Sequence, residues 1–251
     1  MKISVCMATY NGGKYIERQL DSILVQLSAD DEVIVVDDAS SDNTADIITA
    51  RNDPRIKLSR NPTNIGVLKN FENAIRRASG DLIFLSDQDD LWLEDKVSSI
   101  LDAFSSNPQV TLVFGNAELM NAEGQSLGRN FWSRRLSAGL ISNLVKNQFL
   151  GCTLAFRRGL CDWALPFPVD IPMHDMWLGL VNALYGKSLY LEKPLIRYRM
   201  HPQSATYGTI TARGRVAFLK KAYWRYSLIK NLIARYKHIK KMRKSCAKLT
   251  G

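Results

Sequence analysis

Three carboxylates occupy four consecutive positions in the stretch S-D-Q-D-D-L-W, Ser86 to Trp92, directly after the apolar run 82–85. Like charges side by side disfavour ionisation unless a cation, a turn or a partner offsets them. The D-x-D spacing of Asp87 and Asp89 suits Mg²⁺ or Mn²⁺, which prefers oxygen ligands and is often held by one or two carboxylates together with substrate phosphates. Alone, this spacing is a weak signal, because acidic residues are common in turns.

Apolar runs alternate with helical patterns through the first part of the chain. Strand-like runs cover residues 3–8, 33–36, 55–59 and 82–85, and helical patterns cover 16–27, 45–50 and 67–78. This alternation predicts an α/β fold, a Rossmann-like, mostly parallel sheet with helices on both faces. Ligands of such sheets bind beyond the carboxyl ends of the strands. Polar loops follow these ends at 9–11, 37–38 and 87–89, and we expect them to converge on one ligand.

The second half of the chain is less regular. Helices are predicted over 94–105 and 173–185, and strands over 110–114, 152–156 and 188–191. Residues 120–150 show no clear period and predict a loop-rich wall that carries the sequence F-W-S-R-R.

The familiar glycine-rich phosphate loops are missing from the sequence. It contains neither G-x-G-x-x-G at the first helix nor G-x-x-x-x-G-K-[ST], which disfavours a dinucleotide dehydrogenase and a P-loop NTPase. The segment A-T-Y-N-G-G-K after the first strand also lacks the glycine-rich loop that a sugar nucleotidyltransferase would need. A sheet that binds a nucleotide diphosphate without such a loop needs another positive charge, and a carboxylate-bound cation provides one.

Composition indicates one soluble globular protein. The 251 residues are 46% hydrophobic and 23% charged, which argues against disorder. No apolar stretch reaches about 18 residues, and the N-terminus enters a strand pattern at once, so we expect no transmembrane helix, no signal peptide and a cytoplasmic location. The four cysteines show no C-x-x-C spacing and are expected to be buried or neutral thiols.

Charge is unevenly distributed along the chain. Residues 193–251 contain 16 Lys/Arg and no Asp/Glu, and the other 18 basic residues face all 24 acidic ones. Residues 213–248 read as a basic amphipathic helix whose predicted apolar face comprises Tyr226, Ile229, Leu232, Ile233, Tyr236 and Ile239, with Lys230, Lys237, Lys241 and Lys244 on another. We expect peripheral contact with an anionic membrane. The alternatives are packing on the body and, more weakly, nucleic-acid binding.

Five spaced motifs together resemble a known enzyme family. They are A-T-Y-N-G-G at 8–13, V-V-D-D-A-S-S-D-N-T at 35–44, N-I-G-V-L-K-N-F at 64–71, G-D-L-I-F-L-S-D-Q-D-D-L-W at 80–92 and M-H-D-M-W-L at 173–178. This series looks like the inverting glycosyltransferases of the GT-A fold, family 2, and with Y-R-x-H at 198–201 it is most similar to bacterial rhamnosyltransferase-like members. The resemblance spans residues 3 to about 205. It departs at Pro202-Gln203-Ser204, which replace the usual small or Asn-containing segment.

The resemblance implies a nucleotide site. Asp38 is expected to accept a hydrogen bond from the base. Thr9, Tyr10 and Asn11 are expected beside the base and ribose, and Lys69 near the nucleotide. The alternatives are a turn or helix N-terminal carboxylate at Asp38 and a solvated helix lysine at Lys69.

A second group of residues is expected at the diphosphate. By the same resemblance, Asp89 binds the metal directly, while Asp87 contacts the ribose or completes the metal shell. His201 is expected to complete that shell or contact the diphosphate, or else to be a packed or solvated histidine. Arg197 and Arg199 are expected to assist by pairing with phosphate.

The resemblance assigns the chemistry to Asp175. Inverting transfer needs one base to take the proton of the acceptor hydroxyl, which attacks from the face opposite the leaving nucleotide. The alternative is an aspartate that begins a helix with a favourable dipole contact. His174 is expected to be structural, and Trp177 to line the acceptor or the core. Gly151 is expected to leave a tight passage beside the sugar, and Asp90 to cap the next helix or sit in a turn.

These expectations define a domain plan and a function. Residues 1–212 form a catalytic domain, with a nucleotide-binding half at 1–115 and an acceptor half at 116–212, and residues 213–251 form the basic helical tail. We expect a metal-dependent inverting glycosyltransferase of cell-surface polysaccharide synthesis. Its donor is a nucleotide-diphosphate sugar, with deoxythymidine and uridine diphosphate sugars as candidates, and its acceptor is a glycan or lipid-linked glycan. The rival is a noncatalytic nucleotide-sugar or membrane-glycan binding protein on the same fold.

Overall fold

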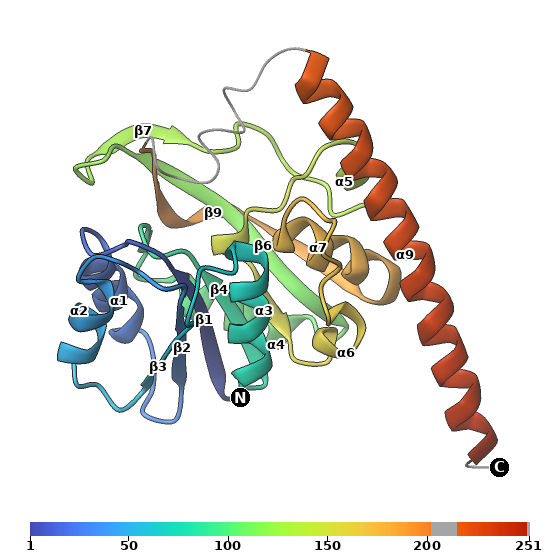
Figure 1. The fold of residues 1–251 in the computed structure, drawn as a ribbon, viewed down its shortest axis with the longest axis horizontal. Coiled ribbons are helices and arrows are strands. Elements are labelled where there is room, and N and C mark those ends of the chain that lie inside the picture. Colours follow the sequence, from blue (N-terminus) through green and yellow to red (C-terminus); the bar gives the residue numbers. More distant parts are fainter. Residues whose placement is uncertain (202–214, 250–251) are drawn as a thin grey trace.

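The first half of the chain forms alternating strands and helices, as predicted. The structure is a computed structural model that describes residues 1–201 and 215–249 (Figure 1). The elements of this half are β1 (Ile3–Thr9), α1 (Ile16–Leu24), β2 (Glu32–Asp37), α2 (Thr44–Ala50), β3 (Ile56–Arg60), α3 (Val67–Arg77) and β4 (Leu82–Ser86). β1 pairs in parallel with β2 and β4, and β2 with β3, so all four strands run the same way.

The second half extends the same sheet. Its elements are β5 (Leu91–Trp92), α4 (Lys96–Ser106), β6 (Val110–Met120), β7 (Ser126–Asn130), α5 (Leu140–Val145), a 3₁₀ turn (Gly151–Thr153), β8 (Ala155–Arg157), α6 (Leu160–Ala164), α7 (His174–Tyr185), β9 (Lys187–Arg199) and α9 (Arg215–Leu249). Within the described residues the sheet has nine strands in the order β3-β2-β1-β4-β8-β6-β9-β5, with β7 paired to β6. β6 and β9 are parallel, whereas β5, β7 and β8 are antiparallel to their neighbours. This half of the sheet is therefore mixed.

Residues of the central strands alternate between two hydrophobic cores. Val5 and Met7 of β1 pack in the core that contains α1 and α4, whereas Cys6 packs in the core that contains α3 and α7. β2 and β4 alternate in the same way. Because successive strand side chains point to opposite faces, a sheet covered on both faces requires strands that are apolar throughout. The predicted α/β fold with helices on both faces is confirmed.

Several predicted boundaries differ from the structure. β6 and β9 each continue well past their predicted ends, and the strand predicted at 152–156 starts only at Ala155, after the 3₁₀ turn. The region 120–150 contains β7 and α5 between its loops. Cys6 and Cys152 are buried and Cys161 partly buried, all as free thiols, in agreement with the prediction.

α9 lies along one side of the body, past α5 and α7 (Figure 1). The predicted apolar face is wrong as a single face, because Leu232 and Ile239 are buried whereas Tyr226, Ile229, Ile233 and Tyr236 are exposed. No helix of the described part of the chain combines the length and apolar character needed to cross a membrane. The predicted domain boundary at 212/213 and the segment Pro202-Gln203-Ser204 lie outside the described residues, as do the side chains of Lys241, Lys244 and Cys246.

Candidate active site

Three loops at the carboxyl ends of β1, β2 and β4 are joined by hydrogen bonds. Gln88 Nε2 donates to the carbonyl of Tyr10 at 3.0 Å, and Tyr10 N–H donates to Gln88 Oε1 at 2.9 Å. Ser41 N–H donates to Asn11 Oδ1 at 2.8 Å, and Asn11 N–H donates to Ser40 Oγ at 2.9 Å. The predicted meeting of the three loops at one edge of the sheet is therefore confirmed.

The first and third loops approach each other closely at Gly12. A Cβ atom at this position would lie 2.2 Å from Gln88 Oε1, so the glutamine amide would have to move away. The glutamine between the two aspartates of D-Q-D thus has a structural role, because its amide clamps the backbone of the β1 loop.

Asp89, in the loop after β4, and His201, just past the end of β9, lie close together. Asp89 Oδ2 lies 2.7 Å from His201 Nε2, and the histidine is only 6% exposed. His201 Nδ1 is buried and has no hydrogen-bond partner within the described residues. An oxygen and a nitrogen ligand that already face each other, beside further carboxylates, fit the donor set of a divalent cation such as Mn²⁺.

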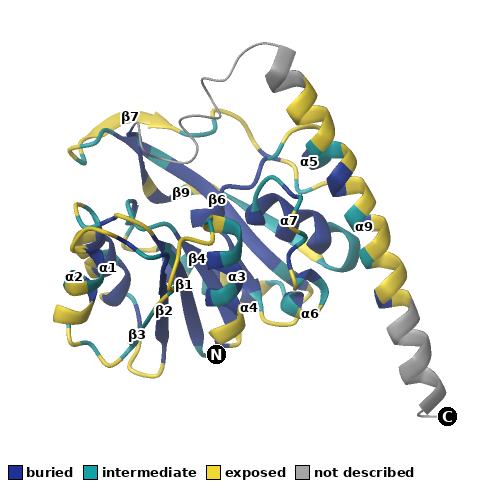
Figure 2. Ribbon diagram, viewed as in Figure 1, coloured by how far each residue is buried: buried dark blue, intermediate teal, exposed yellow. Residues whose placement is uncertain are grey.

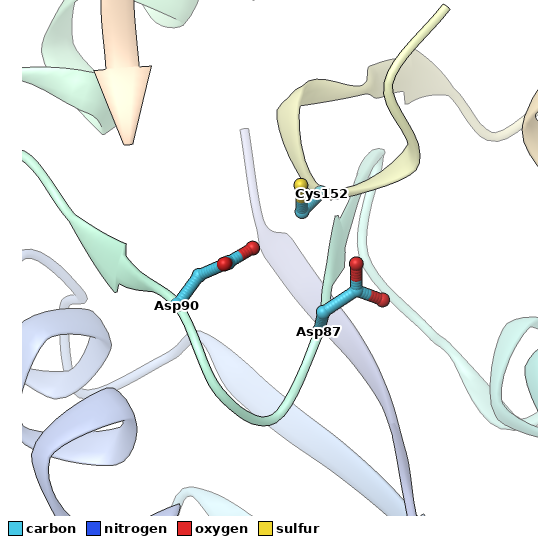
Figure 3. Close-up of side chains that lie close together, drawn as sticks. All are labelled: Asp87, Asp90 and Cys152. Atoms are coloured by element: carbon cyan, nitrogen blue, oxygen red, sulfur yellow. The ribbon is translucent and has the colours of Figure 1, made fainter. Parts of the chain in front are cut away.

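Asp87 is the third predicted metal ligand. Asp87 is partly exposed as a residue. Burial of its carboxyl raises the pKa to about 7, and the charges of Asp89 and Asp175 raise it further. A bound cation would favour the ionised form by offsetting these charges. The side chain rises from the loop after β4 in Figure 3, near Asp90 and Cys152.

Asp90 does not cap α4, whose N-cap residue is Asp95, and instead lies in the loop between β4 and β5. It is 1% exposed, and its Oδ1 accepts the N–H of Arg199 at 3.0 Å. Potential ligand atoms of Asp87, Asp90 and Cys152 lie within 4.8 Å of one another (Figure 3). Burial, followed by the charges of Asp90 and Asp87, raises the pKa of the Cys152 thiol well above its usual value. A neutral thiol is a poor ligand for Mg²⁺ or Mn²⁺, so the candidate metal site is on the carboxylate side.

A buried lysine offsets part of this negative charge. Lys96 is 0% exposed, and its Nζ donates to the carbonyl of Cys152 at 2.7 Å and lies 3.7 Å from the centroid of the Trp92 ring. Burial lowers its pKa to about 7, while the Cys152 thiol and the carboxylates of Asp90 and Asp87 act in the opposite direction. Lys96 is the first residue of α4, a position that carries no sequence signal of burial.

Asp175 is the second residue of α7 and lies beside the same sheet edge. It is 6% exposed, and burial raises its pKa to about 6. Hydrogen bonds from the N–H of Met176, at 2.6 Å, and from Asn147 Nδ2, at 3.3 Å, act in the opposite direction because they favour the ionised form. A carboxylate with a pKa just below neutral is suited to take a proton at physiological pH.

Asn147 holds this carboxylate in a defined orientation. Phe149 N–H donates to Asn147 Oδ1 at 3.1 Å, so the amide group of Asn147 must face Asp175 with its NH₂ end. Phe149 itself packs on Gly179 of α7, where a Cβ would lie 2.0 Å from its ring. No local signal in residues 120–150 connects Asn147 with α7, so its role could not be predicted from the sequence.

The other residues predicted to lie near the base are His174, Gly151 and Trp177. The ring of His174 stacks on Phe71 at 4.0 Å between centroids, and burial lowers its pKa to about 3, so it is a neutral, structural histidine as expected. Gly151 is buried, and a Cβ there would lie 3.0 Å from His174 Nε2. Trp177 is fully buried and donates from Nε1 to the carbonyl of Ala164 at 2.8 Å. It is a core residue and not an acceptor wall.

The predicted nucleotide residues lie in the two loops nearest β1 and β2. Asp38 is 3% exposed, and its carboxylate accepts Asn61 Nδ2 and the N–H groups of Ile65 and Gly66 at 2.8–2.9 Å. It therefore ties the N-I-G loop to β2. Thr9 is buried, whereas Tyr10 is 49% exposed. The roles of these residues toward a nucleotide stay predictions.

Lys69 and Arg199 are both engaged by the protein itself. Lys69 Nζ lies 3.1 Å from Glu72 Oε2 on α3. Arg199 is 3% exposed, donates from Nε to the carbonyl of Asp89 at 2.7 Å and from Nη1 to that of Ala122 at 2.9 Å, and lies over the ring of Tyr15. It fixes the backbone of the acidic loop. Arg197 pairs with Glu118 at the surface, at 3.2 Å.

Comparison with known proteins gives related sequences and one shared fold. The rhamnosyl transferase RfbG of Shigella flexneri, named as a dTDP-rhamnosyl transferase, is 29% identical over 250 residues, covering 90% of this chain and 79% of its own length. WfgD of Escherichia coli, named as a UDP-Glc:α-D-GlcNAc-diphosphoundecaprenol β-1,3-glucosyltransferase, is 30% identical over 182 residues, covering 72% of this chain and 70% of its own. The chain spans 61% to 79% of the length of these and other curated relatives.

The solved structure of the mannosyltransferase PcManGT from Pyrobaculum calidifontis, in complex with GDP-Man and Mn²⁺, matches with a TM-score of 0.65. It covers 98% of this chain and 79% of its own at 18% identity, so it establishes the GT-A fold alone. The model of the family described as "Glycosyl transferase family 2" matches residues 4–161, a segment that includes the three converging loops, the acidic stretch and Gly151. Together with WfgD and RfbG, this match shows that the chain belongs to glycosyl transferase family 2.

Proposed function

We propose that the protein is a metal-dependent inverting glycosyltransferase that transfers a hexosyl or deoxyhexosyl group from a nucleotide-diphosphate sugar to a glycan or lipid-linked glycan. One observation carries this proposal: Asp175, a buried carboxylate with a pKa of about 6, lies beside the Asp87, Asp89 and His201 cluster. The names of RfbG and WfgD, one a rhamnosyl and one a glucosyl transferase, support this class of donor and a role in cell-surface polysaccharide synthesis.

The reaction is a single displacement at the anomeric carbon. The acceptor hydroxyl oxygen forms a bond to that carbon from the face opposite the nucleotide, while its proton passes to Asp175. The bond between the anomeric carbon and the phosphate oxygen breaks, and the electron pair leaves with the nucleotide diphosphate. Asn147 and the N–H of Met176 hold the carboxylate so that its free lone pairs can receive the proton.

The diphosphate end of the donor is proposed to lie at the acidic loop. Asp89 and His201 would hold the divalent cation, with Asp87 as a third ligand or as a contact to the ribose. When bound, the cation stabilises the negative charge of the departing diphosphate. Mn²⁺ in the PcManGT structure supports this choice of metal. Arg199 contributes by fixing the backbone of the loop that carries Asp89.

The nucleoside is proposed to lie on the loops after β1 and β2. Tyr10, which is exposed, is suited to stack beside the base, with Thr9, Asn11 and Asp38 around it. Lys69 would approach the nucleotide after release from Glu72. Gly151 would border the sugar next to Asp175.

Substitution of the base is the direct test. Asp175→Asn should leave donor and Mn²⁺ binding intact and abolish transfer, and a variant that retains full turnover would refute the assignment. The matched control is Asp162→Asn, an exposed aspartate in the first turn of α6, which should keep wild-type activity. Donor hydrolysis by the wild-type protein distinguishes an enzyme from a noncatalytic binding protein, which would bind the donor and leave it intact.

Metal dependence has its own test. Asp89→Ala should lose the tightening of nucleotide-diphosphate binding that Mn²⁺ produces, as measured by calorimetry with and without the ion. Equal affinity under both conditions in the wild type would contradict the proposed cation site. A thermal-shift panel of nucleotide-diphosphate sugars would identify the donor.

A lipid-linked acceptor would place the enzyme at the inner face of the cell membrane, as we also propose. The support is electrostatic, since residues 193–251 hold 16 basic and no acidic residues. Such a segment is attracted to anionic lipid.

A further inference from the structure

One face of α9 is anchored to the body. Leu228 is 0% and Leu232 is 6% exposed, and both belong to the core that contains α3 and α7. Asn231 Nδ2 donates to Asp170 Oδ1 at 2.8 Å, and Arg235 donates to the carbonyls of Leu165 and Pro166, each at 2.5 Å. These apolar and polar contacts fix how the helix is rotated about its own axis.

Another face of the same helix presents large apolar side chains to solvent. We call these residues the outer stripe: Leu219, Tyr223, Tyr226, Ile229, Ile233 and Tyr236, which are 61%, 54%, 64%, 45%, 50% and 48% exposed. Their spacing of three or four residues places them on one side of the helix. The exposed residues of α9 are visible on the side that faces away from the body in Figure 2. Soluble proteins rarely expose so many large apolar residues together without a partner.

The charge of α9 indicates what kind of partner fits. Residues 215–249 contain 12 Lys/Arg and no Asp/Glu. Lys230 and Lys237 follow Tyr223 at intervals of seven residues and therefore lie on the same side, and Lys240 follows Tyr236 by one turn; all three are exposed. A second copy packed along this stripe would bring like charges together, which disfavours a helix-to-helix dimer. An anionic partner with an apolar layer would neutralise the lysine charges and cover the exposed apolar side chains.

We propose that the outer stripe lies in the interface of an anionic membrane, with α9 parallel to the membrane plane. Tyrosine rings and isoleucines would enter the boundary between headgroups and acyl chains, a position typical of tyrosine. Lys230, Lys237 and Lys240 would extend their ammonium groups to lipid phosphates while their stems stay against apolar atoms. That this contact brings the enzyme to a lipid-linked acceptor rests on the proposed function, whereas binding of α9 to lipid does not require it.

Docking of α9 would also fix the position of the catalytic base relative to this surface. Arg225 Nη2 donates to the carbonyl of Val145, the last residue of α5, at 2.6 Å. Asn147 follows two residues later and donates to Asp175. The helix that contacts lipid is therefore bonded to the segment that orients the base, which suits an acceptor carried by the same lipid surface.

The test is co-flotation of the full chain with vesicles of phosphatidylcholine alone or of an equimolar mixture with phosphatidylglycerol. The stripe variant is Tyr226→Ser, Ile229→Ser, Ile233→Ser, and the charge variant is Lys230→Gln, Lys237→Gln, Lys240→Gln. The matched control is Val25→Ser, Leu127→Ser, which removes exposed apolar residues, 80% and 41% exposed, the first directly after α1 and the second in β7. All substituted side chains are exposed, so far-UV circular dichroism and the melting temperature should be unchanged.

The wild type and the control should float with the anionic vesicles and remain unbound with phosphatidylcholine alone. The stripe variant should lose binding more than tenfold, and the charge variant about fivefold per lysine removed. Transfer to a soluble acceptor should be equal in all variants, which separates this proposal from the proposed reaction. A wild type that ignores anionic vesicles overturns the proposal. So does a stripe variant that still binds them but loses a dimer detected by light scattering, because the stripe would then be an interface between copies.

Discussion

Replacement of Asp175 by asparagine should abolish activity and, at neutral pH and above, stabilise the folded protein. The carboxylate is 6% exposed, and removal from water raises its pKa from 3.8 to about 6 despite hydrogen bonds from Asn147 and Met176. The ionised form is therefore less stable in the folded protein than in the unfolded chain. Asparagine is nearly the same size and does not ionise, so the variant avoids this penalty.

The sign and size follow from linkage between proton binding and folding. The folded protein binds the Asp175 proton more tightly than the unfolded chain, so this contribution to stability is fully present below pH 3.8 and is lost as the pH rises through about 6. With 1.36 kcal/mol for each pKa unit, the loss approaches about 3 kcal/mol. The free energy of unfolding of Asp175→Asn minus that of the wild type should therefore grow by about this amount between about pH 4 and pH 8. The altered hydrogen bond to Asn147 shifts this difference equally at every pH.

Urea unfolding followed by circular dichroism at several pH values measures the difference. The matched control is Asp46→Asn, an exposed aspartate in the first turn of α2, for which the difference should not grow with pH. A flat difference for Asp175→Asn would show that its carboxylate is not held in a desolvated site. The base assignment would then lose its physical basis.

Three further predictions concern neighbouring residues. Asn147→Leu removes a hydrogen bond to the ionised base, so kcat should fall about tenfold while the donor KM stays unchanged. In the wild type the pH–rate profile should rise through about pH 6 as Asp175 ionises, and in the variant this rise should move to higher pH. His201→Ala should raise the half-saturating Mn²⁺ concentration more than tenfold in the same assay. Gln88→Ala frees the backbone of Tyr10, and calorimetry should show weaker nucleotide-diphosphate binding with the Mn²⁺ requirement retained.

The order of elements in the first half was predictable because each unit is local. A buried strand, a turn and an amphipathic helix carry their signals within about thirty residues. In the second half, β6 continues through Gly115 and Asn116 and β9 through Pro194, residues that usually end a strand. Their mutual pairing sustains them, with register shifts at Gly115 and Asn116. A single sequence shows the breakers but not the partner strand that offsets them.

The meeting of three polar loops was predictable for a similar reason, since parallel strands bring their carboxyl ends to one edge. The finer division of roles was not. Asp90 looked like a cap because acidic residues commonly precede helices, yet Arg199 and Cys152, from distant elements, enclose it. Which residues of the tail are buried could not be predicted either. Its apolar residues form a broad arc, and only contact with the body divides Leu232 from the exposed Ile233.

Lys96 resolves how three carboxylates can lie so close together. It violates two local preferences at once, because a fully buried ammonium is costly and a cation at a helix N-terminus opposes the helix dipole. The nearby carboxyl groups of Asp87 and Asp90 offset part of this cost, although burial still lowers the pKa of Lys96 to about 7. Burial and the neighbouring carboxyl groups still raise the pKa of Asp87 to about 7 and that of Asp90 well above its usual value. A divalent cation bound by Asp87 and Asp89 would favour ionised carboxylates by offsetting their charges.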